Sequence, residues 1–217
     1  DSDISAADAR TVARAEVGSI SGQSVPDGIL AGTGIVPTTL VLGTLSPDRS
    51  IGTLSVAGNL TLQSTATTLI ELDPGTGATD RVNVSGTATI GGSLQVVWLG
   101  AALPTNGQVF TIIQAGSVAG TYGTVTVTNP LAYFNFAPVY TANQVNLVAT
   151  QLPFNNTGAT HDVRNLMQQS GALDAHAGAG AGKADFNAVL LQLLRLSPGA
   201  ATNALHSMSG EVYASFT

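Results

Sequence analysis

A short unit of alternating strand and glycine-containing turn occurs twice in this chain, and it constrains the fold more than any other feature. The first copy, 45–62 (LSPDRSIGTLSVAGNLTL), places two apolar-polar-apolar runs on either side of Gly58-Asn59. Alternation with a period of two sends one set of side chains to a core, and a Gly-Asn pair favours a tight turn. The second copy is 82–90 (VNVSGTATI). Because such a unit cannot bury its apolar face alone and must stack on a neighbour, the repetition predicts a β-solenoid.

Composition is consistent with a packed core and argues against nucleic acid as a partner. Hydrophobic residues make up 44% of the chain and charged residues 9%, which excludes simple disorder. Thirteen acidic residues against seven basic ones give a net charge of −6, so the basic face that phosphate binding requires is missing. The chain has no cysteine, which removes disulfides and thiolate metal sites.

The periodicity divides the chain into three segments. Residues 1–27 carry a weak apolar stripe that fits a short helix begun by Ser5 or Asp8, a frayed end, or the remnant of an upstream solenoid rung. Residues 28–150 read as short strands with glycine-rich corners, and Pro37 predicts that its strand is an edge or a corner. Residues 151–217 change to a helical period. There Thr160 is a candidate helix cap, and Ser197-Pro198 supplies an N-cap followed by proline at the first helical position.

Aromatic side chains gather just before the helical segment. Tyr133, Phe134, Phe136 and Tyr140 fall within ten residues. A solenoid must close its open end or expose a templating strand edge, and bulky rings packed over the last rung would close it. The alternative is that these are ordinary strand aromatics of a β-hairpin.

The sequence resembles a known family over most of its length. The stretch from Ser46 to Leu62, the preceding 30–34 (LAGTG) and the later 79–97 (TDRVNVSGTATIGGSLQVV) are similar to the passenger-associated repeats of autotransporter (type Va secretion) passenger domains. The segment 205–214 (LHSMSGEVYA) is similar to the Leu-Ser-Gly-Glu segment that precedes the translocator barrel of that family. Two positions depart from the pattern: Asp48 stands where the family usually has glycine, and Met208 where it has leucine.

The resemblance implies a mainly β fold, a right-handed parallel β-helix capped by a β-hairpin (the autochaperone region) and followed by an α-helical linker. It implies a non-enzymatic folding and secretion module, anchored at the bacterial outer membrane through a barrel outside this chain, that templates vectorial folding at the cell surface. The alternative is a surface adhesin or self-association segment that binds host glycans or sister molecules. The expected partners are therefore its own translocator barrel and, in the alternative, sister molecules or a host-cell surface.

Specific residues are expected to carry the folding role. The expected linker motif is Leu205, Met208, Ser209, Gly210 and Glu211. Apolar positions of the two repeats and their neighbours form the expected core, and the aromatic group forms its cap: Leu54, Val56, Leu60, Leu62, Val82, Val84, Leu94, Val96, Tyr133, Phe134 and Phe136.

No catalytic, cofactor or metal site is expected. Glu71, Asp73 and Asp80 surround a Pro-Gly turn, where acids usually serve solubility, and they lack the glycine-aspartate nonapeptide of calcium-binding β-rolls. The three histidines (His161, His176 and His206) have no zinc-binding spacing, and Ser209-Gly210 lacks the context of a nucleophilic serine. A lyase or hydrolase on a β-solenoid is the enzymatic alternative, but the arginines of the strand segment are scattered.

Overall fold

The computed structural model describes most of the strand segment and part of the helical one. The described residues are 12–14, 23–25, 28–48, 50–128, 130–154, 173 and 184–208, without the side chains of 12–14, 23–25, 184–187, 206 and 208. They fall in two units, the first formed by 1–104, 108–128 and 137–148 and the second by 105–107, 129–136 and 149–217. Residues 105–107, 129–136 and 149–150, expected with 28–150, thus fall in the second unit with the helical segment.

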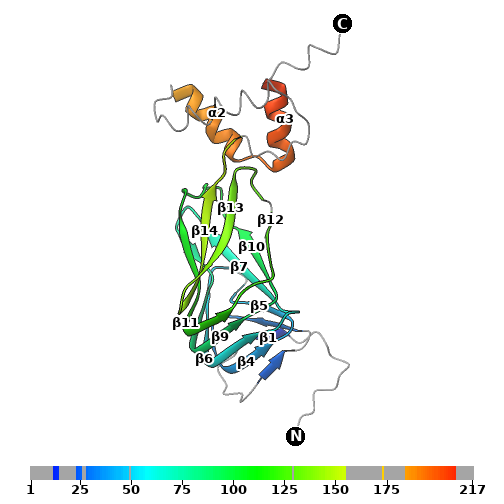
Figure 1. The fold of residues 1–217 in the computed structure, drawn as a ribbon, viewed down its shortest axis with the longest axis vertical. Helices are drawn as coiled ribbons and strands as arrows, with labels where there is room; N and C mark the ends of the chain where they lie inside the picture. The colour runs from blue at the N-terminus through cyan, green and yellow to red at the C-terminus, as the bar shows by residue number, and fades with distance from the viewer. Residues whose placement is uncertain are drawn as a thin grey trace. The chain divides into compact units, whose positions relative to one another are not determined.

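The fold is mainly β, and the described strands form two sheets of mostly parallel strands (Figure 1). Sheet A has the order β1 (Val12–Arg14), β3 (Ile29–Ala31), β5 (Thr44–Ser46), β7 (Thr67–Asp73), β10 (Ser93–Trp98) and β12 (Thr124–Thr128), with β8 (Ala78–Thr79) beside β7. Sheet B has the order β13 (Phe134–Tyr140), β14 (Gln144–Gln151), β11 (Val109–Gly120), β9 (Arg81–Ile90), β6 (Thr53–Leu62), β4 (Ile35–Val41) and β2 (Gln23–Val25).

Successive strands alternate between the sheets, so that β4, β6, β9 and β11 lie in sheet B while β5, β7, β10 and β12 lie in sheet A. Each of these strands pairs in parallel with the next of them in its own sheet. In sheet B, β4 pairs with β6, β6 with β9 and β9 with β11. In sheet A, β5 pairs with β7, β7 with β10 and β10 with β12. The parallel order of sheet B ends at β14, which pairs antiparallel with β11. The loop 141–143 joins β13 to β14, and because parallel strands need a long crossover, these two form an antiparallel hairpin.

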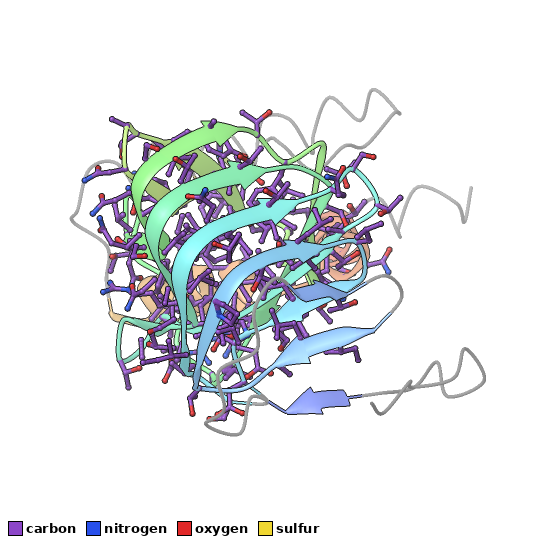
Figure 2. The ribbon with its side chains drawn as sticks, turned by 90° about the horizontal axis from the view of Figure 1, so that it is seen from below. Carbon is purple, nitrogen blue, oxygen red and sulfur yellow. The ribbon has the colours of Figure 1, made fainter. Side chains whose placement is uncertain are left out.

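The tight turn predicted at Gly58-Asn59 is wrong, because β6 continues through both residues. Gly58 has φ +141°, a conformation that favours glycine, and the strand bends there instead of reversing. Figure 2 shows the long strands of sheet B as curved arrows stacked on one another. Pairing with β4 at Ala57 and Leu60, and with β9 at Val56 and Leu60, flanks the bend on both sides and outweighs the local turn preference of the Gly-Asn pair.

Pro37 lies at an irregularity of β4, where the register against β6 shifts between Pro37 and Thr39. The described part of β2 pairs only with Thr39–Val41 and does not reach the proline. The missing proline N–H therefore costs no hydrogen bond to β2, and a strand tolerates proline at such a bulge. The prediction that its strand is an edge is wrong, because β4 lies between β6 and β2. Further upstream, the helix considered for the N-terminal segment is wrong at Val12–Arg14, which form β1 in parallel with β3.

The helical segment contains α2 (Ala184–Leu194) and α3 (Pro198–Met208). The predicted start of α3 is confirmed, since Pro198 is its first residue and the Ala201 N–H donates to the Ser197 carbonyl oxygen. The helix expected after Thr160 lies outside the described residues. The buried cluster of the second unit combines α2 and α3 with aromatic and apolar side chains of the chain before them: Ala132, Tyr133, Phe154, Leu173, Leu190, Leu193, Ala201 and Leu205.

Candidate functional site

The main candidate for a functional feature is a set of apolar rows that run across the parallel strands of the first unit. In sheet B, Leu54 stands opposite Val82, and Val82 stands opposite Ile113. In sheet A, Ile70 stands opposite Val96. These five side chains are 0% exposed, so each strand completes the burial of the strand before it.

The expected core residues are all buried, as period-two alternation requires. Six are fully buried: Leu54, Leu60, Val82, Leu94, Val96 and Tyr133. The others are at most 8% exposed: Val56, Leu62, Val84, Phe134 and Phe136. Burial of a Leu or Val side chain stabilises by about 1.5–3 kcal/mol relative to exposure. The rows therefore contribute much of the stabilisation of the first unit.

Polar side chains join the strands of sheet B at their bends. The Asn59 N–H donates to Thr38 Oγ1 (3.2 Å), and Asn59 Oδ1 accepts the Thr87 N–H (2.9 Å). The Thr87 and Ser117 hydroxyls are 2.8 Å apart. This ladder supplies hydrogen bonds where the backbone register is irregular. A Cβ at Gly86 would overlap Asn59 Oδ1, so the ladder also explains that glycine.

Asp80 is buried, which corrects the expectation that it is a solvated corner acid. It is 0% exposed, and its carboxylate bridges two chain segments: Oδ1 accepts the Gly52 N–H and Oδ2 accepts the Glu71 N–H, both at 2.8 Å. Burial raises the pKa of Asp80 to about 6, against the lowering effect of the two backbone N–H groups. Because both oxygens already accept backbone bonds, Asp80 serves to fix the corner between β7 and β9.

The sequence carried a signal for the burial of Asp80 that was missed. Asp80 has the same parity as Val82 and Val84, so period two places it on the inward face. The nearby acids differ from it. Burial, followed by the charge of Asp48, raises the pKa of Glu71. Asp73 caps the turn after β7 by accepting from the Gly75 N–H and the Thr76 hydroxyl.

Two buried hydroxyls, those of Thr68 and Tyr122, lie in the core. Thr68, which is 0% exposed, stands between Leu45 and Leu94 in sheet A. The hydroxyls of Thr68 and Tyr122 have no hydrogen-bond partner within bonding distance among the described residues. Burial raises the pKa of Tyr122, and the nearby Thr68 hydroxyl offsets part of that rise. Neither hydroxyl faces solvent, so this polar pair is a feature of the core.

The aromatic side chains Tyr133, Phe134 and Phe136 and the linker residue Leu205 lie in the second unit. Tyr133 contacts Phe154, with ring centroids 4.7 Å apart, inside the cluster that includes Leu205 of α3. Tyr133 therefore packs among helical side chains, while Phe134 and Phe136 are buried side chains of β13. Of the linker motif, Leu205 is fully buried; the Met208 side chain and Ser209, Gly210 and Glu211 lie outside the described residues.

No group of three or more His, Cys, Asp or Glu side chains in the described part of the chain is placed to hold a metal ion. His161 and His176, and the side chain of His206, lie outside that part. Among the helices that the structure describes, none is both long and apolar enough to cross a membrane.

Comparison with known proteins adds no assignment. No protein-family model matches the chain, and no curated protein is significantly similar to it.

Proposed function

We propose that this chain is a non-enzymatic folding module from the C-terminal part of an autotransporter passenger, with its strands wound as a right-handed parallel β-helix. In this proposal the hairpin β13–β14 folds first. Each parallel strand then pairs with the exposed edge of a folded strand that comes later in the sequence. The helical segment leads toward a translocator barrel in the bacterial outer membrane, and the module acts at the cell surface.

The single observation that carries the proposal is the in-register stacking of equivalent side chains across successive strands of each sheet. Val56 opposite Val84 and Leu60 opposite Ala88 repeat one alternation from one strand to the next. Such a stack grows by one strand at a time, because a new strand finds both a backbone edge and a row of apolar neighbours already in place. Folding of each added strand releases free energy, which opposes its return through a secretion pore.

The antiparallel hairpin supports the proposed starting point. Strands β13 and β14 are close in sequence, so their pairing needs closure of only a short loop. Val145 and Leu147 of β14 are fully buried, and Val145 stands opposite Ile113 of β11. The hairpin therefore offers β11 a preformed edge and an apolar row.

A matched pair of substitutions tests the direction of folding. Val145→Ala in β14 and Val41→Ala in β4 delete the same atoms from fully buried sites at opposite ends of sheet B. Folding and unfolding rates in urea are measured for both variants and the parent. We expect Val145→Ala to slow folding about tenfold, and Val41→Ala to slow folding less than about threefold while speeding unfolding. A slower folding rate for Val41→Ala than for Val145→Ala refutes growth from the hairpin.

A second experiment tests the link to secretion. Leu62→Asp places an unpaired charge in the row that includes Val41, at a cost of several kcal/mol. Thr61→Asp on the preceding residue, which is half-buried on the other face of β6, is the matched control. In the full-length protein expressed in its bacterial host, we expect Leu62→Asp to lower both surface display and protease resistance, and Thr61→Asp to lower neither strongly. If both properties survive Leu62→Asp, templating is wrong.

A further inference from the structure

Strand β12 ends sheet A with an edge that no described strand covers. Its inward side chains Val125 and Val127 stand opposite Leu94 and Val96, which are fully buried, but they are themselves only half-buried. Thr124, Thr126 and Thr128 are exposed. The edge thus leaves backbone groups and an incomplete apolar row for a further strand.

The other C-terminal edge, in sheet B, carries a protective feature that β12 lacks. Strand β13 contains Pro138, which removes a backbone donor and hinders pairing with a further strand. Strand β12 (TVTVT) has neither proline nor a charged side chain. Lys, Glu and Pro are the usual means of protecting an edge, and no Asp, Glu, Lys or Arg occurs between Arg81 and Asp162. Charge repulsion from this part of the chain therefore does not oppose edge-to-edge contact.

The sequence of β12 is the same read in either direction. If two copies pair antiparallel about Thr126, each Val125 stands opposite Val127 of the partner, and each Thr124 opposite Thr128. Such an arrangement is isologous, because the same surface serves on both copies. It also matches β-branched residues with β-branched residues on both faces.

We propose that β12 binds β12 of a second copy of this chain, which joins the two copies of sheet A into one continuous sheet. The proposal does not depend on the secretion role, since it rests only on the edge and its symmetry. With five residues per chain, the contact is much smaller than a standard interface, so we expect a dissociation constant on the order of 100 µM. Because the edge is uncharged, the association should change little with salt concentration.

Sedimentation velocity over a range of protein concentrations tests the association. Thr126→Lys and Thr126→Glu each place like charges opposite one another at the centre of the pair and should weaken association at least fivefold, by rough estimate. An equimolar mixture of the two variants should restore it. Thr89→Lys, at an exposed site on the interior strand β9, is the matched control and should leave it unchanged. A parent chain that stays monomeric at 1 mM, on the order of ten times the expected constant, overturns the proposal.

Cysteine pairing tests the register, since the chain has no cysteine of its own. On mild oxidation Thr126→Cys should form a disulfide-linked dimer, because residues directly opposite have Cβ atoms about 4.5–5.5 Å apart. Thr124→Cys alone should not, whereas a mixture of Thr124→Cys and Thr128→Cys should give the mixed dimer. Faster cross-linking of Thr124→Cys than of Thr126→Cys contradicts the proposed pairing. These nearly isosteric variants remain decisive if a charged variant fails to fold.

Discussion

Replacement of Asp80 by Asn should change how the stability of this chain depends on pH. The pKa of Asp80 rises from its ordinary 3.8 in the unfolded chain to about 6 in the folded one, chiefly through burial. A folded-state pKa above the unfolded value means that the native state holds the proton more tightly between these two pH values. The contribution of Asp80 to stability is therefore complete below pH 3.8 and is lost as the pH rises through about 6.

The magnitude follows from the shift. At 1.36 kcal/mol per pKa unit, the loss between pH 4 and pH 7 is at most about 3 kcal/mol. Asp80→Asn has no titrating group, so it lacks this loss. At low pH the variant should be less stable than the parent by about 1–3 kcal/mol, because its amide N–H₂ faces either the Gly52 or the Glu71 N–H in place of an acceptor. Near pH 7 most of that difference should disappear.

Urea unfolding between pH 4 and pH 8 measures the effect, with the single tryptophan, Trp98, as the fluorescent probe. Glu71→Gln is run alongside because the pKa of Glu71 is also raised, and the charges of Glu71 and Asp48 both act on Asp80. Parallel pH profiles for parent and Asp80→Asn would refute the raised pKa. A gap that widens with rising pH would show that the two N–H bonds dominate over burial.

Four further substitutions have defined expectations. Gly92→Ala should destabilise by about 3 kcal/mol or more in the same urea assay, because φ is +73° and a Cβ would overlap the Ala66 carbonyl oxygen. Gly77→Ala has the same φ but open space around the added Cβ, so it should cost only about 1–2 kcal/mol. Thr68→Val should stabilise by about 1 kcal/mol, since it removes a buried hydroxyl without a bonding partner; a lower thermal midpoint would contradict this. Asn59→Ala should cost about 1 kcal/mol, because the Thr87 N–H loses its acceptor. Equal urea midpoints for the variant and the parent would contradict this.

Much of the core was predictable from the sequence because alternation is a local property of a strand. Leu54, Val56, Leu60 and Leu62 share one parity, so they face the same side wherever the strand lies, and all of them are buried. Parity also places Asp80 inward, and although acids at turns usually serve solubility, this one is buried. The start of α3 followed from Ser197-Pro198, since capping depends on neighbouring residues alone.

The tertiary structure decided what depends on partners distant in sequence. The amides that hold Asp80 belong to Gly52 and Glu71, which lie 28 and 9 residues away. Gly58 bends a strand, where its sequence context predicted a turn, because β4 and β9 hydrogen-bond to β6 on either side. Alternation repeats every second residue, so it predicts which side chains point inward. It does not predict which strands become neighbours. That choice is made by hydrogen bonds and packing between segments, and these exist only once the chain has folded.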